Sequence, residues 1–293
     1  NWQMGVNMQY IIENNDFKVT VDSKGCEVVS VLKKSDDTEY IWCGDASAWK
    51  RHTPVLFPVV GRYKNDCTIY DGKEYHMTQH GFARDHDFKC IYAGKEEVKF
   101  LLTSTDEMKE VYPFDFELYI SYRLKKNVIE VEWGIKNPSE ETIYFTIGGH
   151  PAIHFAKENE TKADYRLYFP EKDHLNYILV DIAEGGADPK KVYEMKLEDG
   201  YYPLTEELFE RDALIFDENQ IEEVWISHKD GTPYVGMKCE GFSNFGIWSV
   251  KDAPFVCLEP WMGRCDDVGF EGDISEKPGI NSVESGGTFE KSY

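Results

Sequence analysis

Apolar and polar residues alternate along much of the chain, and this period of two constrains the fold more than any other feature. The pattern runs through 17–21, 117–124 and 128–135. Successive side chains of a strand point to opposite faces, so the alternation indicates strands with one buried face. Lys125-Lys126-Asn127 separates the last two segments and predicts a turn between two antiparallel strands.

Two Asp-Gly pairs predict further hairpins, because Asp-Gly supplies the positive φ angles of tight two-residue turns. Asp71-Gly72 separates 68–70 from 74–76, and Asp230-Gly231 separates 224–227 from 234–237. Helical signals are few. Residues 45–51 fit one or two helical turns. Residues 205–211 predict a short helix with Thr205 as its N-cap and Leu208-Phe209 turned inward.

The pattern as a whole predicts one all-β domain over residues 1–293, a large antiparallel β-sandwich of two stacked sheets. A βαβ alternation and a long amphipathic helix are both missing from the sequence. Residues 183–202 are rich in Gly, Asp, Glu and Lys, and we expect a surface excursion there rather than a domain boundary. Met8 looks like a natural start, so residues 1–7 are expected to be an appended prefix.

Charge and cysteine content narrow the function classes. The chain carries 32 Lys and Arg against 54 Asp and Glu, a formal charge of −22. Such a surface repels phosphate backbones and anionic lipid, which argues against nucleic-acid and membrane-surface binding. We find neither a spanning segment of about 20 apolar residues nor a signal peptide. The seven scattered cysteines, without a CxxC pair, predict reduced thiols and a cytoplasmic location.

Three segments carry candidate chemistry. His80 lies in Gln79-His80-Gly81-Phe82-Ala83-Arg84-Asp85, where the alternative is an ordinary loop histidine bonded to backbone. His150 follows two glycines and precedes Pro151, which fits either a close ligand approach or a structural turn. Glu259 closes the apolar run 255–258 before Pro-Trp. A desolvated carboxylate there suits a general base, and a surface glutamate at a strand end is the alternative.

Metal catalysis is not expected. His76 and His80 are four residues apart, as are His150 and His154. Such pairs converge only on a helix, whereas in a strand they stand about 13 Å apart at a rise of about 3.3 Å per residue. One carboxylate and two histidines instead suit proton transfer on a polyol.

Taken in order, the motifs resemble the aldose 1-epimerase (galactose mutarotase-like) family, in its branch of short bacterial mutarotase-related proteins. The resemblance rests on four segments spread over nearly the whole chain, namely 54–62, 79–85, 149–152 and 258–261. It implies a β-supersandwich enzyme that interconverts α and β anomers of a free aldose without a cofactor. Glu259 matches the general base of the family and His150 its general acid.

The same resemblance implies four substrate-binding residues. His80 matches the histidine that holds the sugar near C1, and Arg62 matches a sugar-contacting arginine. Asp212 corresponds to an aspartate that bonds ring hydroxyls, and Arg84 lies in a motif that lines the cleft. The His-Gly-Phe-Ala-Arg loop is also similar to the hexose-6-phosphate mutarotase branch, so Arg62 and Arg84 could hold a phosphate. Pairing of Arg84 with Asp85 or Asp87 would favour the neutral hexose.

Three rival functions stay open from the sequence. They are a hexose-6-phosphate mutarotase, a non-catalytic carbohydrate-binding sandwich, and a hydrolase or lyase on a similar fold. A glycosidase needs two carboxylates around the scissile bond, and the motifs offer one. A small-molecule sugar is the expected partner, and a homodimer is neither favoured nor excluded.

Overall fold

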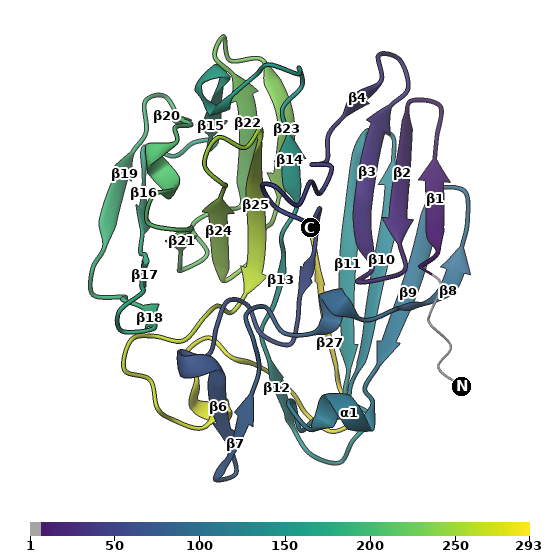
Figure 1. Cartoon of the computed structure of the whole chain (residues 1–293), viewed down its shortest axis with the longest axis vertical. Coiled ribbons are helices and arrows are strands. Elements are labelled where there is room, and N and C mark those ends of the chain that lie inside the picture. The colour runs from purple at the N-terminus through teal and green to yellow at the C-terminus, as the bar shows by residue number, and fades with distance from the viewer. Residues whose placement is uncertain (1–6) are drawn as a thin grey trace.

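The computed structural model describes residues 7–293, and within them the chain is almost entirely β-structure (Figure 1). These residues form 27 strands, one short α-helix, α1 (Asp106–Lys109), and five 3₁₀ turns. The 3₁₀ turns span Lys64–Asp66, Ala83–Asp85, Lys162–Asp164, Glu207–Phe209 and Ile274–Glu276. Residues 1–6 of the expected prefix lie outside the described residues. The all-β antiparallel prediction is confirmed.

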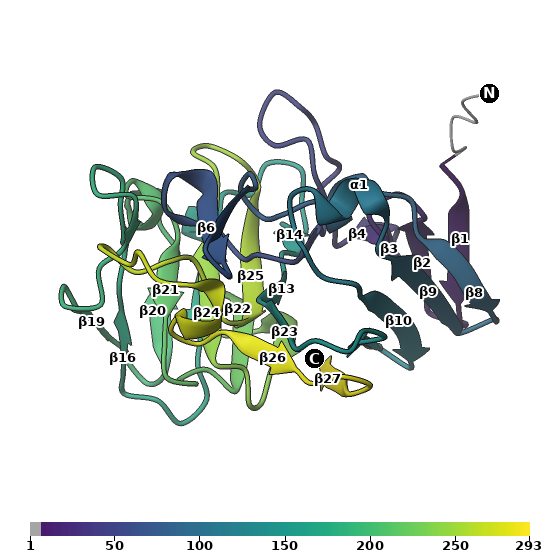
Figure 2. The same ribbon diagram turned by 90° about the horizontal axis from the view of Figure 1, so that it is seen from below.

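Two sheets stack face to face on one side of the molecule (Figures 1 and 2). One has the order β1 (Gln9–Glu13), β2 (Phe17–Asp22), β3 (Glu27–Lys33), β4 (Thr38–Glu39). The other has the order β27 (Thr288–Ser292), β11 (Val128–Lys136), β10 (Glu117–Lys125), β9 (Glu97–Thr103), β8 (Lys89–Ala93). Tyr10 of β1 packs edge-on against Phe100 of β9, with ring centroids 5.3 Å apart.

The alternation of apolar and polar residues in the sequence corresponds to an alternation of buried and less buried side chains in these strands. In β10, every second residue from Leu118 to Leu124 is buried against the facing sheet. β10 pairs with β11 over nine residue pairs around the turn that the sequence predicts.

The other side of the molecule holds a six-stranded and a four-stranded sheet. The first has the order β21 (Leu214–Phe216), β24 (Asn244–Trp248), β25 (Phe255–Met262), β13 (Ile147–Gly149), β5 (Val55–Leu56), and β14 (Ala152–His154) also pairs with β25. The second has the order β20 (Tyr201–Pro203), β15 (Tyr165–Tyr168), β22 (Glu223–His228), β23 (Pro233–Lys238).

Four two-stranded ribbons complete the fold. They are β6 (Cys67–Tyr70) with β7 (Lys73–His76), β12 (Ile143–Phe145) with β26 (Asn281–Val283), β16 (His174–Tyr177) with β19 (Tyr193–Lys196), and β17 (Val180–Asp181) with β18 (Gly186–Ala187).

One large apolar cluster extends through both sides of the molecule. Two smaller clusters are separate from it. One gathers Leu56, Val60, Ile178, Ala187, Ile215 and Trp261. The other gathers Trp42, Ala152, Ala253, Phe255 and Cys257, with Trp49 and Trp248 packed on it. Both include residues of the six-stranded sheet, and the residues between them hold the candidate site.

One of the two expected two-residue turns is correct. Asp71 and Gly72, with φ of 49° and 75°, join β6 to β7 directly. Asp230-Gly231 does join an antiparallel pair, β22 with β23, so that hairpin is confirmed, but its turn is wider than predicted: β22 ends at His228 and β23 begins at Pro233, leaving a four-residue loop. The Asp230 carboxylate accepts the Thr232 N–H at 2.8 Å. That N–H and the bond from His228 N to Thr232 O hold the wider loop, in which Gly231 has the positive φ.

The helical expectations are correct only in part. Residues 45–51 form one turn, in which the N–H groups of Ala48 and Trp49 both donate to Asp45 O. Residues 207–209 form a 3₁₀ turn rather than the predicted helix, and Thr205 does not cap it. The carboxylate of the neighbouring Glu206 does not cap the turn either, and instead accepts a hydrogen bond from Lys162 Nζ at 3.0 Å.

The segment 183–202 is more ordered than an excursion. It contains β18 and β19 and the start of β20, and Gly186 and Ala187 are buried. Its glycines thus partly serve close packing: a Cβ on Gly186 would lie 2.8 Å from the backbone of Asp267.

Candidate active site

The candidate site is built on β25, the longest strand of the six-stranded sheet. Its first seven residues are buried, so side chains on both faces are covered, and β24 pairs with one edge of the strand and β13 and β14 with the other. Glu259 lies in the middle of this strand with 1% of its surface exposed. An ionisable carboxylate in such a position is costly unless it has polar partners or serves a reaction.

His150 lies directly across from Glu259. The register pairs Gly148 with Trp261 on one side and Ala152 with Cys257 on the other. The same register between them sets His150 opposite Glu259. Pro151 has no N–H to give to the ladder, so the strand is interrupted here, between β13 and β14. The imidazole Nε2 of His150 lies 2.9 Å from Glu259 Oε1.

Polar atoms of this pair are left without hydrogen-bond partners. Within residues 7–293, His150 Nδ1 has no hydrogen-bond partner, and Glu259 Oε1 forms no well-aligned hydrogen bond although it lies 2.9 Å from His150 Nε2; both atoms are buried. Trp49 stacks on the His150 ring at 4.9 Å, and Trp248 meets it edge-on at 5.6 Å. Buried polar atoms normally find partners, so unsatisfied ones inside an aromatic surround are typical of a ligand site.

His80 stands beside this pair, with its ring centroid 5.6 Å from that of His150. The Gly61 N–H donates to His80 Nδ1 at 2.9 Å, and the His80 N–H donates back to Gly61 O at 2.8 Å. Burial, His150 and nearby arginines hold the pKa of His80 well below 6.5. His80 is therefore neutral near pH 7, and because Nδ1 accepts, its proton is on Nε2, ready to donate.

Gly81 allows the His80 loop to approach this closely. Gly81 has φ of +68°, and a Cβ there would lie 2.3 Å from Phe57 O. Phe57 O accepts the N–H groups of Phe82 and Ala83, which fastens the loop to the chain just beyond β5. The glycine in the His-Gly-Phe motif thus brings His80 to the sheet that carries His150 and Glu259.

The two arginines are placed differently from each other. Arg62 is half exposed, and its Nη1 donates to both carboxylate oxygens of Asp66, at 2.8 and 2.9 Å. Arg84 donates to Gln79 O at 2.9 Å, and its buried Nε has no partner among the described residues. Among the described residues Arg84 forms no ion pair with Asp85 or Asp87, the alternative that the sequence left open, and Asp85 pairs with Arg51 instead, at 3.0 Å.

The environment of Arg84 is unfavourable for its charge. Burial and the nearby Arg51 lower the pKa of Arg84 to about 10, and Asp85 and Glu27 offset this only in part. Arg84 remains a cation near pH 7, with a free donor in a desolvated position.

Asp212 is exposed, with φ of 73°, and its Oδ1 accepts the N–H of Ala213 at 2.7 Å. The register aligns Ile215, not Asp212, with Glu259 across β24. Asp212 lies three residues further along, about 10 Å at about 3.3 Å per residue. In this structure the side chain of Asp212 stabilises the turn in which it lies.

Trp261 and Gly246 were not among the sequence candidates. The indole of Trp261 lies on the sheet face that carries Glu259, over Gly148 and Gly246. A Cβ on Gly148 would lie 2.5 Å from Trp261 Cδ1, and a Cβ on Gly246 would lie 2.3 Å from Trp261 Cζ2. Trp261 Nε1 is buried and has no partner within residues 7–293. A glycine inside an apolar strand, as in Phe245-Gly246-Ile247, was the available signal.

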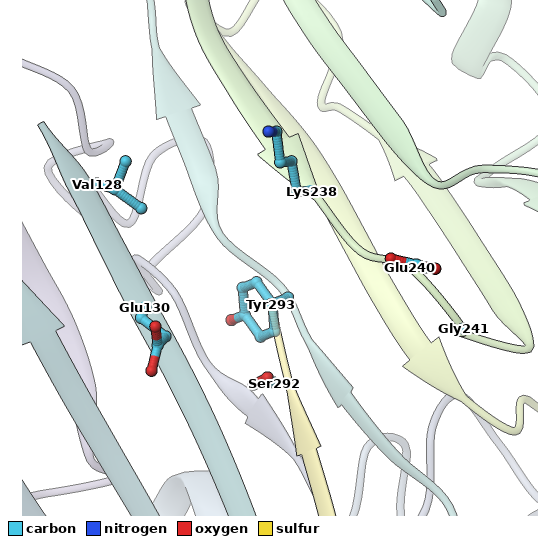
Figure 3. A pocket seen from close by; sticks show the side chains of 7 residues that line it. All are labelled: Val128, Glu130, Lys238, Glu240, Gly241, Ser292 and Tyr293. Carbon is cyan, nitrogen blue, oxygen red and sulfur yellow. The ribbon is translucent and has the colours of Figure 1, made fainter. Parts of the chain in front are cut away.

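The reverse face of this strand is filled by Tyr293. A Cβ on Gly149 would lie 2.6 Å from the Tyr293 hydroxyl. Tyr293 also lines a separate groove of about 590 Å³ between the two sides of the molecule, together with Val128, Glu130, Lys238, Glu240, Gly241 and Ser292 (Figure 3). None of His80, His150 and Glu259 lines that groove.

Three further observations bear on partners and compartment. All seven cysteines are free thiols. No helix in the described part of the chain is long and apolar enough to cross a membrane. Among the described residues, Cys67, Glu74 and His76 of the β6–β7 hairpin have potential metal-ligand atoms within 4.8 Å of one another.

Comparison with known proteins agrees with this geometry. The family model for aldose 1-epimerase matches residues 8–263. The plasmid-encoded protein LacX of Lactococcus lactis subsp. lactis is 28% identical over 290 residues, covering 96% of this chain and 97% of LacX.

Solved structures show the same fold. The galactose mutarotase related enzyme of Lactobacillus acidophilus superposes with a TM-score of 0.91 at 35% identity, covering 97% of this chain and 95% of that one. A galactose mutarotase-like protein of Lactobacillus casei gives 0.88 at 27% identity, covering 97% and 98%. These likenesses confirm the supersandwich that the family resemblance implies.

Proposed function

The chain belongs to the aldose 1-epimerase family, and on that premise we propose that it is a mutarotase that interconverts the α and β anomers of a free hexose. The observation that carries the proposal is the buried pair of His150 Nε2 and Glu259 Oε1, which lie 2.9 Å apart on neighbouring segments of the six-stranded sheet. Family membership supports an epimerase-type enzyme in general, and the proposed reaction and substrate go beyond it.

The pair fits the geometry of hemiacetal opening. The ring oxygen and the anomeric hydroxyl are both bonded to C1, so an acid and a base that act on them must lie side by side. Glu259 takes the proton of the C1 hydroxyl as the C1–ring-oxygen bond breaks, and His150 gives a proton to the ring oxygen. The open aldehyde turns about C1–C2. The reverse transfers then close the ring on the other face, and each group contributes about 10²–10⁴-fold.

The neighbouring groups have supporting roles in this proposal. Neutral His80, with its proton on Nε2, donates a hydrogen bond to the sugar near C1. The unpartnered Nε1 of Trp261 offers a second donor from the same sheet face. Arg62 contacts the sugar at the mouth of the site, and Asp212 is the proposed partner of a ring hydroxyl after its turn opens.

The hydrolase alternative needs a second carboxylate beside Glu259, and no other buried acid in the described part of the chain is free for that role. Two acids in residues 7–293 are fully buried, Glu259 and Asp266, and Asp266 is ion-paired with Lys277. A glycosidase needs a second carboxyl group beside the scissile bond. A non-catalytic sugar-binding protein would use the same contacts without accelerating anomer exchange, so only a rate measurement separates it.

A hexose 6-phosphate is the second candidate substrate, because Arg84 Nε is buried and unpartnered while Arg51 lies near. Two guanidinium groups can hold a phosphate through charge-assisted bonds. Against it, the net charge of −22 repels anions at long range, and Arg62 and Arg51 are already paired with acids. We therefore favour the neutral hexose.

Polarimetry on freshly dissolved α-glucose and α-galactose and on their 6-phosphates tests the proposal. We expect faster mutarotation of a free hexose and no new reducing ends from oligosaccharides. Sugar binding without acceleration would leave a binding protein, and release of reducing ends would indicate a hydrolase. A cytoplasmic location is proposed with it, on the argument of the seven free thiols.

A further inference from the structure

The hairpin β6–β7 presents three metal-ligating side chains on one face. Cys67 lies directly opposite His76 in the register, and Thr68 lies opposite Tyr75. Thr68 and Tyr75 are buried, so their side chains point inward. Because side chains alternate along a strand, Cys67, Glu74 and His76 share the outer face.

Their ligand atoms are close to one another. One ligand atom each of Cys67, Glu74 and His76 lie within 4.8 Å of the others, and His76 Nε2 is 3.9 Å from Glu74 Oε2. Zinc bonds of about 2.0–2.3 Å bring tetrahedral ligand atoms to about 3.3–3.7 Å apart. The exposed side chains of Glu74 and His76 can close that small gap by rotating.

The backbone beneath these side chains is held in place. The Asp71 N–H at the hairpin tip donates to Asp273 Oδ2 at 2.8 Å, and Ile69 pairs with Asp273. The buried side chains of Thr68 and Tyr75 fix the other face. A metal ion would therefore meet a hairpin whose register is already set, which limits the entropy lost on binding.

We propose that Cys67, Glu74 and His76 form a Zn²⁺ site with water as the fourth ligand. Thiolate and imidazole suit zinc and disfavour Mg²⁺ and Ca²⁺, which prefer oxygen. As the sulfur–zinc bond forms, the Cys67 thiol gives its proton to solvent. Because zinc displaces this proton, it binds more tightly as the pH rises.

This site is separate from the sugar chemistry. Its ligands lie on an exposed ribbon, whereas His150 and Glu259 are buried in the six-stranded sheet. It does not need a His76–His80 pair, because the ligands converge across the hairpin rather than along one strand.

Titration of the metal-free full-length protein with Zn²⁺, and with Co²⁺ as a spectroscopic probe, tests the proposal. We expect one ion per chain, release of about one proton, and a near-ultraviolet thiolate–Co²⁺ charge-transfer band. Cys67→Ser should abolish the band, and His76→Gln should weaken binding at least about tenfold. Cys43→Ser, which removes an exposed free thiol elsewhere, is the matched control and should change nothing.

Absence of one-to-one binding, or a charge-transfer band that survives Cys67→Ser, would overturn the site. Mutarotation is measured in the same samples before and after chelation and should not change. Since metal binding and anomer exchange are read separately, failure of one leaves the other intact.

Discussion

Replacing Gly246 by alanine should damage the site through Trp261 without touching an acid or a base. Gly246 lies opposite Glu259 in the β24–β25 pair. An added Cβ would lie 2.3, 2.4 and 3.0 Å from three atoms of the indole. The backbone of Gly246 does not have a positive φ, so alanine adds no backbone strain and the whole effect comes from this contact.

The size of the displacement follows from the contact distances. Ordinary contacts begin near 3.4 Å, so the indole must move by about 1.1 Å from its 2.3 Å approach. Trp261 is buried and Gly148 contacts its other edge, so the strand has little room to absorb the shift. We expect a stability loss of about 1–3 kcal/mol from overpacking. A misplacement of about 1 Å near the reacting groups should lower turnover by about 10²-fold.

Gly236→Ala is the matched control. Its Cβ would approach the ring of Trp225 as closely, at 2.4 Å, but in the sheet of β15, β20, β22 and β23. Urea unfolding measures the stability of both variants, and polarimetry on α-glucose, well below either unfolding transition, measures turnover. Gly246→Ala should lose activity and Gly236→Ala should keep it. Full activity in Gly246→Ala, or equal losses in both, would refute the placement of the site beside Trp261.

The two histidines and Arg84 give three more tests. His150→Asn should lower kcat far more than it raises KM, because proton delivery matters in the transition state, whereas His80→Asn should weaken sugar binding as well; equal mild effects would contradict this division. The free energy of unfolding should fall as the pH drops below about 6.5, because unfolded His80 takes up a proton that the folded protein resists, and His80→Asn should flatten this slope in urea titrations. Arg84→Ala should leave hexose turnover unchanged at low and high salt; a salt-sensitive preference for the 6-phosphate that vanishes in Arg84→Ala would identify a sugar-phosphate enzyme instead.

The sandwich could be predicted because the local pattern of residues marks most of its strands. Alternation marks β10 and β11, which each have one buried face, and the turn at 125–127 joins them. β25 has no such period, since it is buried on both faces and reads as one apolar run. The wide loop at 229–232 depends on which N–H the Asp230 side chain accepts, and an Asp-Gly pair alone does not determine that.

The candidate site, too, could be predicted only in part: its residues from the motifs, but not the contacts between them. The motifs singled out His80, His150 and Glu259, and the structure brings these three together. Their contact depends on the register of strands about 110 residues apart, which no local pattern encodes. The partner of Asp85 is Arg51, 34 positions away, rather than its neighbour Arg84. Long-range packing also decides that Gly148 and Gly246 leave room for an indole.

The most direct test of the central claim is the rate of anomer exchange in Glu259→Gln. Glutamine keeps the shape of the buried side chain but cannot accept the C1 proton. Polarimetry on α-glucose or α-galactose gives the rate, and calorimetric titration gives sugar affinity on the same preparation. We predict turnover lowered by about 10²–10⁴-fold, close to the spontaneous rate, with binding retained. A Glu259→Gln protein that keeps most of its activity would contradict the assignment of Glu259 as the base.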